Sequence, residues 1–288
     1  SPGTVTNANG TIGLNATSTN NQVVVQDGGA VWNSGGYLYV GYSGANNTLL
    51  ITNGAVAQSV TGVLGYNTSA SNNQAVVNGS TWTSSGNLFV GFSGAGCRVM
   101  VSGGAVLQNV IGFMGLTISA SNSQVVVSGP NSTWNNSAIM EVGYASIGNT
   151  LLLTNGGTAI SGGDAIIGNN ASSTGNLLEM NGGQLNVAAN LDVRRGTLQL
   201  DSGSIITSNF LATLAGGTLV INGGSLSASN STVSTGQPLV VGNGSSAATF
   251  TLLGNGLHTF NDGLTIAGNA RLTGSGTING VLTVASGG

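Results

Sequence analysis

No lysine occurs among the 288 residues, which include one histidine, one cysteine and three prolines. The four arginines, Arg98, Arg194, Arg195 and Arg271, are too few to neutralise a phosphate backbone, so the sequence predicts no nucleic-acid partner. The single cysteine, Cys97, makes neither an intramolecular disulfide nor a cysteine zinc site. Apolar runs reach only four or five residues. A membrane-spanning helix needs roughly 20, so we expect no membrane insertion.

Glycine and small polar residues fill the chain instead. There are 50 glycines without a three-residue period, which excludes collagen, and 40% of the residues are hydrophobic, which excludes an ordinary disordered chain. Only seven acidic and four basic side chains are present. The composition therefore predicts a packed protein that is not an enzyme, binds no cofactor or metal, and has a stability that varies little with pH.

A long internal repeat dominates the sequence. The segment 21–44, with Asn-Gln-Val-Val-Val at its start and Leu-Tyr-Val-Gly-Tyr near its end, returns as 73–94 and again as 123–144. Each copy carries one tryptophan, and Trp32, Trp82 and Trp134 are 50 and 52 residues apart. Weaker half-repeats lie between the copies, so the true unit is half as long. Its equivalent apolar residues are Val23, Leu49, Ala75, Val99, Val125, Leu151 and Leu177, spaced by 26, 26, 24, 26, 26 and 26 residues.

Each unit contains short runs of Val, Ile and Leu, separated by clusters of Gly, Asn, Ser and Thr that favour turns. These runs predict strands of three to six residues and almost no helix. A unit this short buries its apolar face only when units stack about 4.8 Å apart. The sequence thus predicts an all-β, right-handed parallel β-helix (β-solenoid) of about 11–12 coils, each of roughly 20–26 residues. Stacked amides are expected along one corner, from Asn21, Asn47, Asn73 and Asn149.

The repeat changes near residue 174. Regular coils of 24–26 residues are expected over 12–173, and shorter, less regular coils over 174–288. The phrases there are Gly-Thr-Leu-x-Leu at 196–200, Asn-Gly-Gly-x-Leu at 181–185 and Gly-Ser-Gly-Thr-Ile-Asn-Gly at 274–280. We interpret residues 1–288 as one solenoid with a change of cross-section, rather than two domains.

These phrases resemble the passenger-associated β-strand repeats of bacterial autotransporter passengers and related large surface proteins. The resemblance is strongest over 174–288 and looser over 12–173. It implies secretion, an extracellular location on a bacterial cell surface, and display as a β-helical stalk or adhesin. Within these 288 residues we expect no membrane barrel of the kind that anchors such passengers.

Three features of the sequence raise the question of catalysis: two short motifs and one group of charged residues. Residues 201–204, Asp-Ser-Gly-Ser, partly match the phrase around a protease nucleophile, but the only imidazole base available is His258. Residues 242–247 satisfy a relaxed dinucleotide-binding pattern, yet the following residues predict a strand where that site needs a helix.

The third candidate is a local group of charges formed by Asp192, Arg194, Arg195 and Asp201. A related expectation is a stack of Asp164, Glu179 and Asp201 on successive coils. Glycoside hydrolysis needs two carboxyl groups in suitable proximity. The alternative is a solvated ion pair between Asp192 and Arg194, which contributes little.

Aromatic residues recur in two ranks. The three tryptophans alternate with Ala57, Leu107 and Ile160, and the pattern leaves open whether they pack large against small in the core or face outward to stack on sugars. A second rank consists of residues that directly follow a glycine, and these side chains too either pack in the core or face outward. Its members are Tyr42, Tyr66, Phe92, Leu116 and Tyr144. Tyr37 and Tyr39 are expected to be exposed, whereas Met100 and Met114 are expected in the core. The candidate contacts with a glycan or a lateral partner are Tyr37, Tyr39, Tyr42, Tyr66, Phe92 and Tyr144.

The sequence favours a non-enzymatic structural or adhesive β-solenoid. No polar cap is recognisable at either end, so we expect either head-to-tail stacking of copies into a fibre or continuation in a larger chain, with a glycan or another cell-surface molecule as a ligand. The alternative is a carbohydrate-active enzyme or a glycan-binding β-helix module, which requires the charges or the aromatic rank to line an exposed surface.

Overall fold

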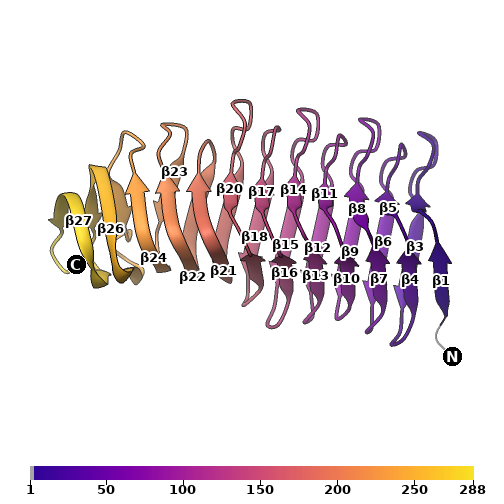
Figure 1. Ribbon diagram of the computed structural model, residues 1–288, viewed down its shortest axis with the longest axis horizontal. Helices are drawn as coiled ribbons and strands as arrows, with labels where there is room; N and C mark the ends of the chain where they lie inside the picture. The colour runs from indigo at the N-terminus through magenta and orange to yellow at the C-terminus, as the bar shows by residue number, and fades with distance from the viewer. Residues whose placement is uncertain (1–2) are drawn as a thin grey trace.

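The computed structural model describes residues 3–288 as a stack of parallel β-coils (Figure 1). All 27 strands belong to one sheet system, every strand pairing between coils is parallel, and the chain makes about 11 turns. No helix occurs in residues 3–288. The predicted all-β parallel solenoid is therefore confirmed. The chain progresses along one axis, with its first and last coils at opposite ends.

Seven N-terminal coils have three short strands each, apart from the first described coil, which has two. The first face consists of β3 (Gln22–Gln26), β6 (Thr48–Thr52), β9 (Gln74–Asn78), β12 (Arg98–Ser102), β15 (Gln124–Ser128) and β18 (Thr150–Thr154). The second consists of β1 (Thr4–Asn7), β4 (Val31–Ser34), β7 (Val56–Ser59), β10 (Thr81–Ser84), β13 (Val106–Asn109), β16 (Thr133–Asn136) and β19 (Thr158–Ser161). The third consists of β2 (Gly10–Ile12), β5 (Tyr37–Val40), β8 (Thr61–Leu64), β11 (Leu88–Val90), β14 (Gly112–Met114), β17 (Met140–Val142) and β20 (Ala165–Ile167).

The C-terminal coils are built differently, because most of their strands are long and run continuously around the corners. The strands are β21 (Leu177–Val193), β22 (Thr197–Ala212), β23 (Thr218–Ile221), β24 (Gly224–Val233), β25 (Leu239–Val241), β26 (Ala248–Ile266) and β27 (Ala270–Val284). Strand β21 alone pairs with β18, β19 and β20, so it covers all three faces. At the junction Leu151 pairs with Leu178 rather than Leu177, so the predicted register was wrong by one residue there. Leu178 points inward and is fully buried.

The core alternates large and small side chains between neighbouring coils. Trp82 pairs with Ala57 on one side and Leu107 on the other, and it is fully buried, as is Trp134. Trp32 is 9% exposed. The tryptophans therefore belong to the core. The partner of Trp134 in the next coil is Ala159, not the predicted Ile160, which faces outward.

A glycine on the third face makes room for each tryptophan. A Cβ atom on Gly10, Gly62 or Gly112 would lie 2.6, 2.8 or 2.5 Å from the Cζ2 atom of Trp32, Trp82 or Trp134, respectively. Because glycine and tryptophan sit in neighbouring coils, the packing repeats every two coils. This size matching explains why the clearest sequence period is 50 to 52 residues rather than one coil.

Stacked polar side chains line the corner before the first face, as predicted. Asn47 accepts hydrogen bonds on Oδ1 from both the backbone and side-chain amides of Asn21, at 3.0 and 2.8 Å. Asn73 receives the same two bonds from Asn47, and the pattern returns between Asn149 and Asn176. Cys97 occupies the equivalent position between these sections, and burial raises the pKa of its thiol to about 12. Cys97 therefore takes the place of an asparagine in the ladder, and its thiol is buried.

Outward positions on the first face are also apolar in the regular coils. Met100 pairs with Val76 and Val126 and is half-buried on the outside of the sheet, so its predicted core position was wrong. Met114, in contrast, is fully buried, as predicted. The strand alternation explains the difference, because Met100 lies between the inward-facing Val99 and Val101.

A loop joins the third face of each regular coil to the next coil. These loops stand at the top of Figure 1, at 41–47, 65–73, 91–97, 115–123, 143–149 and 168–176. The next connection, 194–196, is far shorter. It consists of Arg194, Arg195 and Gly196, so two of the four arginines lie in this short connection.

Candidate functional site

An aromatic stripe runs along the third face and the first residues of the adjoining loops. We use this name for Tyr37, Tyr39, Tyr42, Tyr66, Phe89, Phe92, Phe113 and Tyr144, which come from neighbouring coils. Six of them were predicted as contact residues, and Phe89 and Phe113 were missed. The signal for these two was strand alternation, because each lies between inward-facing residues of its strand.

The rings contact one another along the axis. Tyr42 stacks on Tyr66 with centroids 4.8 Å apart, and Phe92 follows Tyr66 at 4.9 Å. Tyr37 stacks on Tyr39 at 5.2 Å within one strand, and Tyr39 meets Tyr42 edge to face at 5.1 Å. The stripe is thus a continuous aromatic surface rather than a row of separate stacking platforms.

Exposure differs within the stripe. Tyr37 is 45% exposed, as predicted, whereas Tyr39 is half-buried among three other tyrosines. Burial raises the pKa of Tyr39 to about 12, so its phenol stays protonated at neutral pH. Tyr42, Tyr66, Phe92 and Tyr144 are also half-buried and lie on the outside of the coil. The stripe therefore offers a rigid, uncharged surface that combines apolar rings with phenolic hydroxyls.

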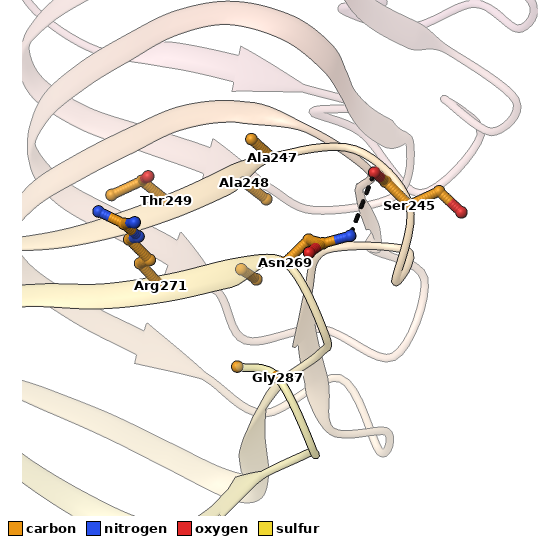
Figure 2. Close-up of a pocket in the computed structure, with 9 residues that line it drawn as sticks. Ser245, Ala247, Ala248, Thr249, Asn269, Arg271 and Gly287 are labelled. Atoms are coloured by element: carbon orange, nitrogen blue, oxygen red, sulfur yellow. Dashed lines mark hydrogen bonds between the residues drawn. The ribbon is translucent and has the colours of Figure 1, made fainter.

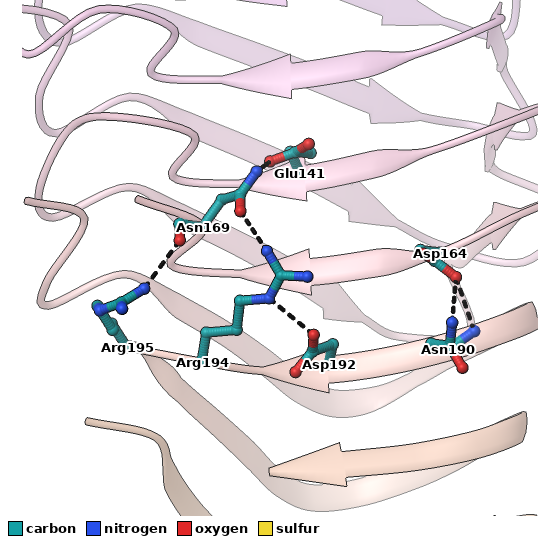
Figure 3. A network of polar contacts seen from close by, with 7 residues as sticks. All are labelled: Glu141, Asp164, Asn169, Asn190, Asp192, Arg194 and Arg195. Carbon is teal, nitrogen blue, oxygen red and sulfur yellow. Dashed lines mark hydrogen bonds and ion pairs between the residues drawn. The ribbon is translucent and has the colours of Figure 1, made fainter. Parts of the chain in front are cut away.

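A polar network begins where the stripe ends (Figure 3). Phe113 and Tyr144 pack edge to face at 5.5 Å, and Phe113 pairs in register with Glu141 of the next coil. Asn169 donates from Nδ2 to Glu141 Oε2 at 2.8 Å, and its Oδ1 accepts a bond from Arg194 Nη1. Arg194 also forms an ion pair with Asp192, with 2.7 Å between Nε and Oδ2. The network thus crosses three coils.

Glu141 is unusual in this network because it is only 5% exposed. Burial raises the pKa of its carboxyl above the ordinary value, although the hydrogen bond from Asn169 and the charge of Arg194 act in the opposite direction. Sequence analysis did not select Glu141. A signal was present: it is the one acidic residue at the outward position of the short third-face strands, where Tyr39, Val63, Phe89 and Phe113 stand in earlier coils.

The other predicted acidic residues are not brought together. Asp201 accepts hydrogen bonds from Gln199 and Asn222 near the first face, while Asp192 lies on the third face beside Ile166. Glu179 pairs in register with Leu152 and Gln199. Asp164 accepts from the backbone and side-chain amides of Asn190 at 3.1 and 2.8 Å. The predicted stack of Asp164, Glu179 and Asp201 was therefore wrong, since each carboxylate lies in a different rank.

Neither of the two sequence motifs, at 201–204 and 242–247, has the partner that its chemistry needs. His258 is fully buried, and its Nδ1 lies 3.0 Å from Ser231 Oγ, not beside residues 201–204. Phe250 packs edge to face against its ring at 6.0 Å, and burial lowers the pKa of the imidazole. After residues 242–247 the chain enters strand β26, so no helix N-terminus is present to hold a pyrophosphate.

A hollow lies near the C-terminal coils (Figure 2). Its lining includes Ser245, Thr249 and Arg271, and Asn269 donates to the Ser245 carbonyl across it at 3.4 Å. The exposed Arg271 is its one charged side chain. In residues 3–288, no group of three or more His, Cys, Asp or Glu side chains is placed to hold a metal ion, and no helix suited to cross a membrane occurs.

Comparison of the chain with protein-family models, characterised proteins and solved structures gives no significant match. The site therefore has to be interpreted from its own chemistry. That chemistry consists of an uncharged aromatic surface joined to a small polar network.

Proposed function

We propose that this chain is a non-enzymatic structural and adhesive rod of a bacterial cell surface, with the aromatic stripe as its contact face. The single observation that supports this best is the continuous parallel strand pairing from β1 to β27 around one apolar column. Such a column gives a stiff rod on the order of 50 Å long. Tyrosine-rich surfaces suit contact with a partner, because their rings add area at a small cost in conformational entropy.

The proposal includes head-to-tail association or continuation of the same solenoid in a larger chain. Within residues 3–288, β1 and β2 pair only with the following coil, and β27 pairs only with β26. Open edges of this kind accept a further parallel strand. Sedimentation of the purified chain over a range of concentrations tests association, and electron microscopy tests for rods. A constant monomer mass would remove the self-stacking form of the proposal.

The contact face is tested with substitutions that the solenoid already tolerates in equivalent positions. Tyr37 pairs with Thr61, and Leu116 stands in the rank of Tyr42 and Tyr66, which defines the triple variant Tyr37→Thr, Tyr42→Leu and Tyr66→Leu. Beads coated with the chain are expected to adhere to host cells or surface glycans, and the variant is expected to lose at least tenfold in retention.

A matched control changes the second face, where both valine and threonine occur at one outward position of successive coils. The variant Val31→Thr, Val56→Thr and Val106→Thr is expected to retain adhesion, because it leaves the aromatic stripe intact. Equal loss in both variants would contradict the assignment of the contact face. Release of reducing ends from a panel of polysaccharides would contradict the non-enzymatic part.

The second candidate function is that of a glycan-binding module, the alternative that the composition left open. The observation that favours it is the junction between the stripe and the polar network, where aromatic, carboxylate and guanidinium groups meet.

A further inference from the structure

Charge is concentrated at one place in an otherwise nearly uncharged rod. Of 11 charged side chains, Glu141, Asp164, Asp192, Arg194 and Arg195 lie within neighbouring coils of the polar network (Figure 3). The network also includes the short connection 194–196, which follows the longer loop 168–176. Stacking of the coils does not require these charged side chains, because the regular coils before the network are held together by amide hydrogen bonds and apolar packing.

Glu141 gives the clearest indication of a ligand. It replaces an aromatic or aliphatic residue in its rank, although its side chain is only 5% exposed. Among residues 3–288, Asn169 is its single hydrogen-bond partner, through Oε2, which leaves Oε1 free to accept. Oε1 reaches the surface of the coil beside an aromatic edge, so it is placed to accept a hydrogen bond from a bound hydroxyl.

The arginines supply the matching donors. Arg194 uses Nε for Asp192 and Nη1 for Asn169, so its Nη2 has no partner among residues 3–288. Arg195 donates from Nη1 to the Asn169 carbonyl, and it forms no ion pair within the described part of the chain. Charged acceptors and donors therefore stand within the same three coils, which is the combination that holds two neighbouring hydroxyl groups.

The charge balance selects the class of ligand. The carboxylates of Glu141, Asp164 and Asp192 outnumber the guanidinium groups of Arg194 and Arg195 by one, so the network does not favour an acidic polymer. Phe113 and Tyr144 supply an apolar surface on the N-terminal side for the C–H groups of a sugar. Glu141 and Asp192 are two coils apart through Ile166, or about 10 Å between Cα atoms, which matches one to two sugar rings.

We propose that the polar network, together with Phe113 and Tyr144, binds a neutral saccharide through a pair of its hydroxyl groups. The inference deepens the proposed function and rests on it, because it names the class of molecule that the contact face recognises. The carboxylate of Glu141 and the guanidinium of Arg194 hold the hydroxyls, while Tyr144 covers one side of the ring.

Calorimetric titration of the full chain with soluble oligosaccharides tests the proposal. The neutral probes are cellohexaose, maltohexaose, xylohexaose and chitohexaose, and hexagalacturonate is the acidic probe. At least one neutral probe is expected to bind. Glu141→Gln and Tyr144→Leu are each expected to weaken it at least tenfold, and leucine at 144 repeats what Leu116 provides in the preceding coil. Arg195→Gln, a change of a partly exposed side chain, is a third variant and is also expected to weaken binding.

Arg271→Gln is the matched control, because it removes a charge from the hollow of Figure 2 and leaves the network unchanged. Its affinity is expected to equal that of the unaltered chain. The proposal is overturned when no neutral probe binds, when hexagalacturonate binds more tightly than every neutral probe, or when Arg271→Gln alone abolishes binding. Rods and bead adhesion that persist after such a result would show that the proposed function stands without this site.

Discussion

The indole of Trp82 lies directly against Gly62, and a Cβ atom at that glycine would stand 2.8 Å from Trp82 Cζ2. The same position would also be 2.8 Å from Leu88 Cδ1. The absence of a side chain at the glycine of one coil therefore leaves room for the tryptophan of the next coil. This pairing of glycine with tryptophan defines the two-coil repeat.

Replacement of Gly62 by alanine tests this packing. The added methyl group has to displace an indole that is fully buried, so Gly62→Ala is expected to destabilise the protein by about 1–3 kcal/mol. Unfolding by denaturant measures the change. Gly28→Ala is the control, because no atom lies within 4 Å of a Cβ there, and its effect is expected to be neutral or slightly stabilising. Similar losses in both variants would contradict the proposed packing.

Ser59 occupies a position where asparagine would complete a buried hydrogen bond. Trp32 donates from Nε1 to Asn7 at 3.1 Å, and Trp134 donates to Asn109 at 2.8 Å. Trp82 Nε1 is buried and has no partner in residues 3–288, since Ser59 stands in the equivalent position of its neighbouring coil.

Ser59→Asn is therefore expected to raise the free energy of unfolding by roughly 1 kcal/mol. Thermal unfolding provides the measurement. The reciprocal change Asn109→Ser removes the acceptor of Trp134 and should lower stability by about 1–3 kcal/mol. An unchanged melting temperature in both variants would mean that the indole N–H groups contribute nothing.

Cys97 interrupts the amide ladder, and Cys97→Asn should repair it. In the coils before it, the backbone amide of Asn47 donates to Asn73 Oδ1 at 2.8 Å. With asparagine at 97, the backbone amide of Asn73 gains the same acceptor, so we expect about 1 kcal/mol of added stability. Denaturant unfolding of this variant and of Cys97→Ala, which supplies no acceptor, separates the hydrogen bond from the loss of the thiol. A larger gain from alanine would argue against the ladder.

His258 makes stability depend on pH despite the small number of titratable groups. Its Nε2 is buried without a partner in residues 3–288, and burial lowers its pKa in the folded state below the ordinary value of 6.5. The unfolded chain then binds the proton more tightly, so this contribution to stability is complete above about pH 6.5 and is lost as the pH falls below it. The loss approaches about 1.4 kcal/mol per pH unit until the folded pKa is reached.

Melting curves between pH 7.5 and 5 measure this effect, because most carboxyl groups titrate below that range. His258→Gln keeps a polar partner for Ser231 but does not titrate, so its melting temperature is expected to be nearly flat over the same range. Equal slopes for the two proteins would assign the pH dependence elsewhere. The expectation of nearly pH-independent stability, drawn from composition alone, and this prediction differ below about pH 6.5, and the melting curves distinguish them.

The candidate site shows where prediction from the sequence stopped. Tyr42, Tyr66 and Tyr144 could be selected because each follows a glycine at a fixed point of the repeat. Glu141 could not be joined to Arg194, because the two are linked only through Asn169 in a third coil. Their meeting depends on the lengths of loops 143–149 and 168–176 and of the short connection 194–196.

The sequence by itself determined the coil, the stacking and the alternation of inward and outward side chains, since a strong period admits only one kind of packing. The tertiary structure alone decided which side chains meet between coils, including Trp82 with Gly62, Ser231 with His258, and Glu141 with Asn169. The physical reason is register. A shift of one residue moves a side chain to the opposite side of a strand, as between Leu177 and Leu178, and only the folded loops fix that shift.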